Sequence, residues 1–524
     1  MKAFSDALVL QRNRILKLAW LAVLSTTLIT LAACGGNGAA NDPSTVTRLE
    51  STSVRASANP LVAQYSVTAS GAAMVSVQFG PTTSYGFQTS AQAMPEGGGT
   101  VSVLVAGMKQ NTLYHMRAVL DTDSGQIVDQ DQTFQTGAIP AGLIPSMQLT
   151  IPAGQTPTPG VQLVSGAGIA EEFALNTAGD IVWYYANPAG YQPYLTKLLP
   201  SGHMLMIYNI TGPPADSGLL EVDLAGTIIR NIDLNDLSHR LQNAGYNEQL
   251  VAIDHDVLML PNGHLLFIVS NTRVFTDLPG YPGETTVQGN AIVDLDQNNN
   301  PVWVWDAFDH LDVNRHPMNF PDWTHANALF YSPDDGNVLL SIRHQHWVIK
   351  IDYENGNGSG DILWKLGHDG DFTLLNSDSP SDWFYAQHDA NIVSANTTGD
   401  FQLALFDNGN NRVLDDGGDT CNPNGQPACY STIAFFDVNE ANRTAQRMWS
   451  VQTPFSFWGG SNQLLSNNNV FFNETAPADL GGYSSRVTEV TQDANPTTVW
   501  KLVFQNQGAY RSQHLGSLYP GVQW

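Results

Sequence analysis

Residues 194–205 read YLTKLLPSGHML and residues 255–266 read HDVLMLPNGHLL, and the two segments align without a gap. Each contains an apolar strand, a turn with glycine and the start of a second apolar strand. Longer turns give two further copies, over residues 325–336 and 388–399, and a weaker copy runs from Trp458 to Phe471. Repeats of this kind say more about architecture than any single motif does.

A hairpin forms the second half of the repeat and usually ends in tryptophan. The six hairpins end at residues 183, 230, 303, 364, 449 and 500, an average spacing of roughly sixty residues. Six such units predict a six-bladed β-propeller over residues 145–524. A solenoid or two stacked sandwiches would be the competing architectures.

The composition agrees with an all-β protein and limits its partners. The chain has 524 residues, of which 42% are hydrophobic and 13% charged, and it contains 46 glycines. These values are typical of a globular chain with many short strands and turns. The formal charge of −26 argues against binding to nucleic acid or to anionic lipid. An anionic substrate would therefore need a local cluster of arginine and histidine.

The N-terminus has the pattern of a bacterial lipoprotein signal. Basic residues between Arg12 and Lys17 precede an apolar run that ends at Leu31-Ala32-Ala33-Cys34. We expect a signal over residues 1–33, a lipidated Cys34 as the mature N-terminus, and a flexible linker over residues 34–60. About fifteen apolar residues are short for a membrane-spanning helix. The expected location is the bacterial cell envelope, in the periplasm or at the outer membrane, with Cys34 as the only membrane attachment.

A second, smaller domain is predicted over residues 61–140. Several short runs there alternate apolar and polar residues between glycine and proline turns, which is typical of a β-sandwich. The segment around Tyr114 resembles the tyrosine-corner strand of fibronectin type III-like sandwiches. Catalytic residue types do not cluster in this domain, so we expect a spacer or a dimerisation element.

Cys421 and Cys429 are the two cysteines outside the signal. In an exported chain, an even pair in a loop rich in proline, asparagine and glycine predicts a disulfide. No other cysteine could complete a structural metal site with them.

Three histidines share one phase of the repeat. His255, His325 and His388 each begin the strand that leads to the glycine turn, and the equivalent positions at Tyr194 and Trp458 are aromatic. The innermost strands of a propeller line its central channel, so residues in one phase converge near the axis. Arg343 lies on the strand after the turn that follows His325. We therefore predict a funnel lined by three imidazoles, with Arg343 at its mouth.

Four segments resemble the bacterial arylsulfate sulfotransferases. They are the run Asp322-Trp323-Thr324-His325-Ala326-Asn327, the strand Arg343-His344-Gln345, the segment Gln387-His388-Asp389, and the terminal residues 510–519, YRSQHLGSLY. The resemblance covers roughly residues 145–524. Its most specific part is the spacing from His325 to Arg343.

The resemblance implies a six-bladed propeller that transfers a sulfuryl group from an aryl sulfate to a phenol. The family needs no nucleotide sulfate donor and no cofactor. His388 would be the nucleophile that becomes a sulfohistidine, with His255, His325 and Arg343 around the sulfuryl oxygens and Asn327 as a further substrate-binding residue. It also implies a homodimer.

These residue types suit sulfuryl transfer, in which positioning and cationic donors stabilise a loose, in-line transition state. Two alternatives remain open. Three convergent histidines could instead hold a divalent metal ion in a hydrolase, although Arg343 would repel such an ion. The propeller could also be a non-catalytic module that binds other molecules at the cell surface.

Overall fold

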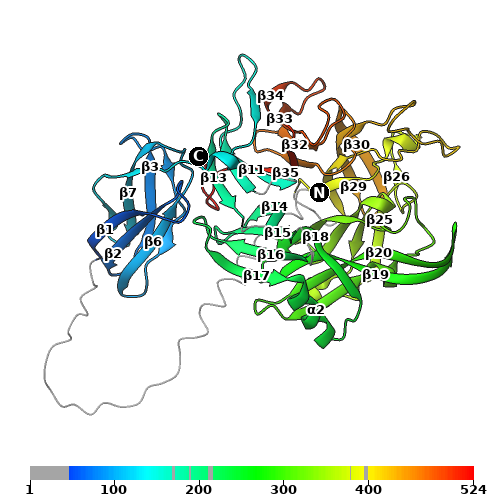
Figure 1. Ribbon diagram of the computed structural model, residues 1–524, viewed down its shortest axis with the longest axis horizontal. Coiled ribbons are helices and arrows are strands. Elements are labelled where there is room, and N and C mark those ends of the chain that lie inside the picture. The colour runs from blue at the N-terminus through cyan, green and yellow to red at the C-terminus, as the bar shows by residue number, and fades with distance from the viewer. Residues whose placement is uncertain (1–46, 168–170, 188–190, 211–215, 378, 395–398) are drawn as a thin grey trace, which may run out of the picture. The chain divides into compact units, whose positions relative to one another are not determined.

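The computed structural model describes residues 47–524, except residues 168–170, 188–190, 211–215, 378 and 395–398 (Figure 1). Within these residues the chain is almost entirely β-structure, which confirms the predicted all-β class. The predicted lipoprotein signal and Cys34 lie outside the described residues. Nowhere in the described part of the chain does a helix combine the length and the apolar character that a membrane span requires.

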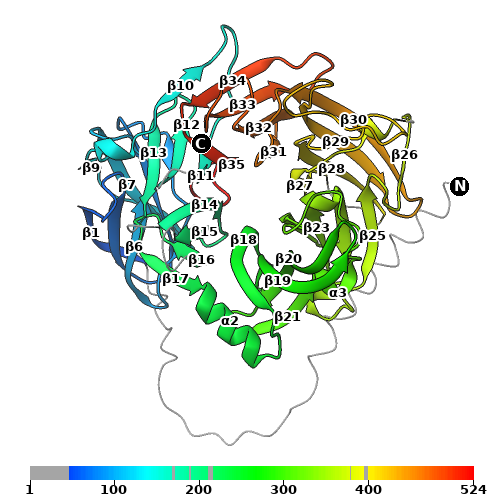
Figure 2. The same ribbon diagram turned by 45° about the vertical axis from the view of Figure 1, so that its right-hand side comes forward.

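Six sheets of four or five strands in the described residues follow one another around a common centre (Figure 2). In each list that follows, the strand nearest the centre comes first. The first three sheets are β35 (Gly508–Leu515), β11 (Val161–Ala167), β12 (Glu171–Asn176) and β13 (Ile181–Ala186); β14 (Tyr191–Leu198), β15 (Met204–Ile210), β16 (Asp216–Val222) and β17 (Ile228–Asp233); and β18 (Gln249–Met259), β19 (Leu265–Leu278), β20 (Tyr281–Leu295) and β21 (Pro301–Asp306). The other three are β22 (Ala326–Ser332), β23 (Asn337–Ile342), β24 (Trp347–Ile351) and β25 (Ile362–Gly367); β27 (His388–Ile392), β28 (Asp400–Asp407), β29 (Ser431–Asn439), β30 (Thr444–Thr453) and β26 (Thr373–Leu374); and β31 (Ser461–Leu464), β32 (Asn469–Thr475), β33 (Ser485–Thr491), β34 (Thr498–Phe504) and β10 (Met147–Thr150).

Apolar side chains fill the spaces between consecutive sheets. Ile268 on β19, for example, belongs to the same buried cluster as Leu340 and Ile349 on the following sheet. Comparable clusters join the second sheet to the third, the fourth to the fifth and the fifth to the sixth. Consecutive sheets therefore bury their apolar faces against each other.

Tryptophans at the outer edge attach four of the six sheets to the next sheet. The indole nitrogens of Trp183, Trp305 and Trp449 donate to backbone carbonyls in the outer hairpin of the following sheet, each at 2.9 Å. Trp500 on the last sheet donates to Thr177 of the first at 2.8 Å. The last strand, β35, also pairs with β11 from the start of the domain. Both contacts close the ring.

The N-terminal sheets (blue in Figure 1) precede the ring. One contains β1 (Arg48–Ala56), β2 (Ala63–Ser70) and β6 (Gly98–Val105); the other contains β3 (Met74–Gly80), β4 (Phe87–Gln88), β5 (Gln92–Ala93), β7 (Leu113–Thr122), β8 (Gly125–Val128) and β9 (Gln132–Gln135). The backbone N–H of Lys109 donates to the Tyr114 hydroxyl at 3.0 Å. This contact back to a residue shortly upstream has the form of a tyrosine corner.

The predicted flexible linker over residues 34–60 is wrong from Arg48 onward. Residues Arg48–Ala56 form β1, which pairs with β2 along its whole length. Most of its side chains are exposed, and only Leu49 and Val54 pack against the core. Because backbone hydrogen bonds rather than an apolar pattern hold this strand, its composition resembles that of a linker.

Helices contribute little to the fold. In the part of the chain that the structure describes, the helical segments are α2 (Leu234–Asn243), α3 (Ala307–His310) and four short 3₁₀ turns over Ala141–Leu143, Arg343–Gln345, Glu354–Gly356 and Pro380–Asp382. The turn Arg343–Gln345 follows β23 directly and is fully buried. It places the predicted arginine at the inner end of the fourth sheet.

Candidate active site

A cavity of about 580 Å³ lies at the centre of the ring. All six sheets contribute to it at one phase of the repeat, through Tyr194, His255, His325, His388, Trp458 and Tyr510. The remaining lining residues are Gln192, Pro193, Asn209, Asp254, Arg343 and Phe457. The structure therefore brings the three predicted histidines and the predicted arginine together on one cavity.

Backbone irregularities at the inner strands direct these histidines. His255 and His325 have left-handed φ values of 49° and 48°, and Asp389, next to His388, has a φ of 46°. The strand register shifts at each of the three positions. Such bulges and strained residues re-aim side chains and occur often at functional sites. Here they break the strand alternation where the chain reaches the cavity.

His255 is held by a buried carboxylate. Its Nδ1 is in ion-pair contact with Asp254, which also accepts hydrogen bonds from Ser270 Oγ at 2.6 Å and from the Tyr194 hydroxyl at 3.1 Å. Burial opposes ionisation of Asp254, but the contacts with His255 lower its pKa to about 2. Asp254 is therefore a permanent anion beside the imidazole.

His325 has a similar arrangement. Its Nδ1 lies 2.5 Å from Asp322 Oδ2, and its ring centroid is 4.6 Å from that of His255 and 6.3 Å from that of His388. Burial lowers the pKa of His325 and the nearby His255 lowers it further, although Asp322 acts in the opposite direction.

His388 is the most deeply buried of the three, with 1% of its surface exposed. Its Nδ1 lies 2.7 Å from the side-chain oxygen of Asn408, a neutral partner rather than a carboxylate. Burial, and then the charge of Arg343, lower the pKa of His388 far below its usual value. The ring is therefore neutral throughout the physiological pH range.

Arg343 supplies a positive charge without a paired acid. Its Nη1 contacts His344 Nε2, and its Nη2 donates to the Phe457 carbonyl at 2.7 Å. No carboxylate of the described residues lies within ion-pair distance of it, and its buried Nε has no hydrogen-bond partner there. Burial lowers the pKa of Arg343 to about 10, so it stays charged at neutral pH. An external anion would satisfy this guanidinium.

One candidate metal group occurs in the described residues. Asp322, His325 and His344 offer ligand atoms within 4.8 Å of one another. However, His344 Nδ1 lies 2.7 Å from the Asp322 carbonyl oxygen, and its Nε2 contacts Arg343. Both nitrogens of His344 are therefore engaged, and a guanidinium adjoins the group. His255, His325 and His388 do not form a metal group among the described residues.

Asn327, predicted to bind substrate, is not one of the described residues that line this cavity. It is fully buried, and its side-chain nitrogen donates to the carbonyl of Gln387 at 2.7 Å. That contact supports the segment immediately before His388.

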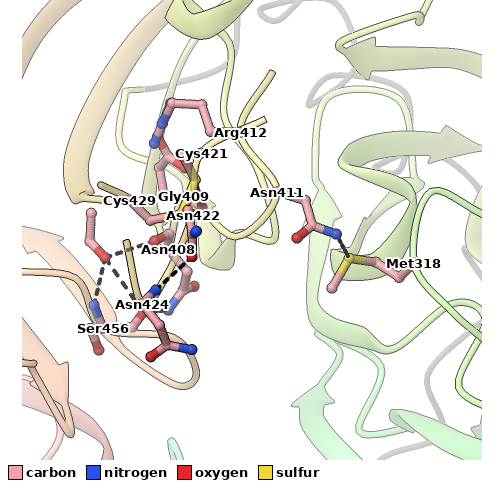
Figure 3. The surroundings of a disulfide bond; sticks show 12 residues. Met318, Asn408, Gly409, Asn411, Arg412, Cys421, Asn422, Asn424, Cys429 and Ser456 are labelled. Atoms are coloured by element: carbon pink, nitrogen blue, oxygen red, sulfur yellow. Dashed lines mark hydrogen bonds and ion pairs between the residues drawn. A yellow bond between two sulfur atoms is a disulfide. The ribbon is translucent and has the colours of Figure 1, made fainter. Parts of the chain in front are cut away.

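Cys421 and Cys429 form a disulfide with an S–S distance of 1.97 Å. Cys421 Sγ lies 3.3 Å from the carbonyl oxygen of Gly409, the residue after Asn408 (Figure 3). The disulfide therefore lies beside the segment that reaches His388.

The sequence analysis missed the partners of the site residues. Asp254 and Asn408 were not identified, and Asp322 and His344 entered only as parts of motifs. Tyr510 entered only through the terminal motif, yet its ring lies 5.9 Å and 6.0 Å from those of His255 and His388. The repeat phase could have placed Tyr510 on the cavity, because β35 is the inner strand of its sheet.

Comparisons with known proteins agree on one family for the ring domain. A model of the arylsulfotransferase family matches residues 152–511. The arylsulfate sulfotransferase AssT of Escherichia coli O6:H1 is 24% identical over 254 residues, which cover 37% of this chain and 39% of the relative.

Two solved structures are also similar. A protein of unknown function from Bacteroides caccae is 14% identical with a TM-score of 0.37, and the match covers 65% of this chain and 94% of that one. The periplasmic gluconolactonase PpgL of Pseudomonas aeruginosa is 11% identical with a TM-score of 0.35, covering 84% and 99%. At these TM-scores neither structure carries an argument about this chain.

Proposed function

Because this chain belongs to the arylsulfotransferase family, we propose that it transfers a sulfuryl group from an aryl sulfate to a phenol by a ping-pong mechanism. The observation that carries the proposal is the cavity in which three imidazoles meet a guanidinium that has no carboxylate partner among the described residues. In a chain with a formal charge of −26, such a guanidinium favours the binding of an anion.

The proposal includes the architecture and the location of the chain. The six sheets would be the blades of a propeller over residues 145–524, and the N-terminal sheets a fibronectin type III-like sandwich. Residues 1–33 would be a lipoprotein signal, so that lipid on Cys34 attaches the protein to the bacterial cell envelope. A homodimer follows from the family resemblance alone.

In the first half-reaction, His388 Nε2 would attack sulfur in line with the aryl oxygen. The N–S bond forms, the S–O bond to the aryl group breaks, and a phenolate leaves. In the second half-reaction, the oxygen of an acceptor phenol attacks the same sulfur, the N–S bond breaks, and neutral His388 is restored. The low pKa of His388 supports this role, because a neutral imidazole is the nucleophilic form.

Arg343 would bind the sulfuryl oxygens and stabilise the negative charge that they carry in the loose transition state. One of His255 and His325 would protonate the departing phenolate and deprotonate the acceptor. Each has a carboxylate on Nδ1, Asp254 or Asp322, which stabilises the protonated ring while the other nitrogen meets the substrate.

The aryl rings of the substrates would lie against aromatic side chains of the cavity. Phe457 lines the cavity with 51% of its surface exposed, and Trp458 lies next to it with a ring separation of 6.2 Å. The hydroxyl of Tyr510 is buried without a hydrogen-bond partner in the described residues, so it is available to donate to the substrate.

The test uses an aryl sulfate such as 4-nitrophenyl sulfate, with and without added phenol. We expect nitrophenol release that depends on the phenol, and in its absence a sulfuryl group trapped on His388, detectable by peptide mass spectrometry. His388→Ala should abolish both signals. The matched control is His264→Ala, in the repeat of His255 but outside the cavity, where His264 pairs with Asp294. Transfer by His388→Ala at the wild-type rate would refute the proposal.

A metal-dependent hydrolase remains the second candidate, because Asp322, His325 and His344 lie close together. It predicts stoichiometric metal in the purified protein, release of free sulfate, and loss of activity with chelators. Transfer to phenol that chelators do not affect would decide for the sulfotransferase. A non-catalytic module predicts no turnover in either assay.

A further inference from the structure

Asn408, the residue after β28, touches the ring of His388 in a single fixed orientation. Its side chain is fully buried. The side-chain nitrogen donates to the carbonyl of Ser456 at 2.7 Å and to that of Gly459 at 3.0 Å. A flipped amide would place its oxygen against these two carbonyls, so the oxygen must face His388 Nδ1, 2.7 Å away. An amide oxygen only accepts hydrogen bonds, and therefore Nδ1 must carry the proton.

A second contact gives the same assignment from the other side of the ring. The backbone N–H of Gly459 points at His388 Nε2 at 3.3 Å, which requires a lone pair on Nε2. The chain comes this close because Gly459 and Gly460 have φ values of 62° and 109°. A Cβ at these glycines would lie 2.5 Å from Thr475 Oγ1 and 2.7 Å from the Phe406 ring, respectively.

The other two cavity histidines have a different kind of partner. Nδ1 of His255 meets Asp254, and Nδ1 of His325 meets Asp322. A carboxylate at Nδ1 stabilises a protonated imidazole, whereas an amide oxygen does so much less. The partner residue thus distinguishes the three rings, although all three come from the same phase of the repeat.

We propose that Asn408 is a positioning residue that holds the neutral His388 ring in the tautomer with its proton on Nδ1, so that the Nε2 lone pair is the nucleophile. This inference rests on the proposed sulfuryl transfer. After attack, the ring carries a positive charge, the proton stays on Nδ1 and is donated to the Asn408 oxygen, and the sulfuryl group is on Nε2. A neutral acceptor stabilises that cation only weakly, which keeps the imidazole a good leaving group for the second displacement. An aspartate would stabilise the cation and slow both halves of the reaction.

The charged and titratable groups around His388 are few. Arg343, His325 and His255 act on it electrostatically, and the Tyr510 ring lies 6.0 Å away. All three interactions oppose protonation of His388. Asn408 is therefore the direct partner whose replacement by a carboxylate would reverse the preference for the neutral ring.

The first measurement is the ¹⁵N NMR of histidine-labelled resting enzyme, with His388 assigned by its loss in His388→Ala. We expect a protonated Nδ1 and an unprotonated Nε2 between pH 6 and 8. A proton on Nε2, or on both nitrogens, in the wild-type protein would overturn the proposal. No substrate is present, so this result is independent of whether a sulfohistidine forms.

The second measurement compares Asn408→Asp with the wild type. We expect both ring nitrogens to be protonated at pH 7, and the acid limb of the pH profile of kcat/KM to move upward by about one unit or more. The control is Asn473→Asp: Asn473 is a buried amide that also donates to backbone carbonyls, those of Ala509 and Tyr510. It should leave the His388 tautomer and the pH profile unchanged.

If Asn408→Asp folds and keeps the wild-type pH profile, the proposal fails even where sulfohistidine is trapped. If that variant does not fold, the wild-type spectrum still decides. Conversely, a neutral His388 with its proton on Nδ1 in an enzyme that traps no sulfuryl group would reject the proposed function and leave the tautomer assignment intact.

Discussion

Arg343 and Arg511 are both buried near the ring axis, but their charges have different partners. Arg511 Nη1 lies 3.3 Å from Asp256 Oδ2 and 3.3 Å from Asp389 Oδ1. Burial alone would lower its pKa, and the two carboxylates raise it instead. Arg343 contacts a neutral histidine and a carbonyl, and burial lowers its pKa to about 10.

The surroundings of Arg511 form a second, polar pocket of about 280 Å³ on the same inner strands. Lys197 joins its network through a 2.5 Å contact with Asp256, so two cations balance two carboxylates. The difference in charge partners distinguishes a structural arginine, Arg511, from an arginine that can bind substrate, Arg343. Charges that are neutralised within the protein stabilise the ring. Arg343, which has no carboxylate partner among the described residues, is available to an external anion.

The largest effect is expected on stability from Arg511→Met. This change leaves Asp389 buried without a direct cation and removes one of two cations from Asp256. Breaking a buried charge network in this way costs roughly 3–5 kcal/mol. Thermal or urea unfolding should show it as a clear loss of stability. An unchanged midpoint would mean that the two arginines are equivalent, and the comparison would fail.

Arg343→Met should give the opposite pattern. Transfer should fall by roughly 10²–10³-fold, the usual cost of removing a donor to developing oxyanion charge. The unfolding midpoint should change little, because no carboxylate loses its partner. Steady-state kinetics with an aryl sulfate and a melting curve on the same sample provide the check. A large loss of stability with normal turnover per folded molecule would assign Arg343 a structural role.

The pKa values of carboxylates in the two regions are shifted in opposite directions. The contacts with His255 lower the pKa of Asp254 from 3.8 to about 2 despite its burial, and burial raises that of Asp389 from 3.8 to about 6. Asp254 therefore contributes stability above pH 4 that is lost as the pH falls through about 2. Asp389 holds its proton in the folded state, so stability falls as the pH rises from about 4 to above 6.

The pH dependence of stability that each carboxylate contributes can be measured with Asp254→Asn and Asp389→Asn. Relative to wild type, Asp254→Asn should lose roughly 2 kcal/mol above pH 4, and this deficit should vanish towards pH 2. Asp389→Asn should improve relative to wild type by roughly 3 kcal/mol between pH 4 and 7. Parallel stability curves for the two variants would contradict the assignment.

The sequence predicted the regular part of the molecule well. The glycine-turn repeat placed His255, His325 and His388 in one phase, and the structure gathers them on one cavity. This succeeds because equivalent positions on inner strands of successive sheets face the same axis. Strand alternation likewise accounts for Asp256, the neighbour of His255, which contacts Lys197 and Arg511 in the other pocket.

The irregular part could not be predicted. Asp254 and His255 are adjacent, so a regular strand would place them on opposite faces, yet the left-handed backbone at His255 brings them together. Asn408 follows β28, which pairs with the strand of His388, and the two residues are twenty positions apart in sequence. No sequence motif links them. Local periodicity encodes neither feature, since both depend on a bulge or on contacts distant in sequence.

The smallest effect is expected at the mouth of the cavity. Phe457→Ala removes an exposed ring but keeps the backbone carbonyl that accepts from Arg343. We expect KM for the aryl sulfate to rise roughly three- to tenfold, the worth of one aromatic contact, with kcat nearly unchanged. The control is Phe330→Ala: Phe330 lines the pocket of Arg511 instead, so its loss should lower stability without raising KM. If both variants change KM equally, Phe457 does not bind the aryl group, and the histidine cavity loses its distinction from the Arg511 pocket in substrate binding.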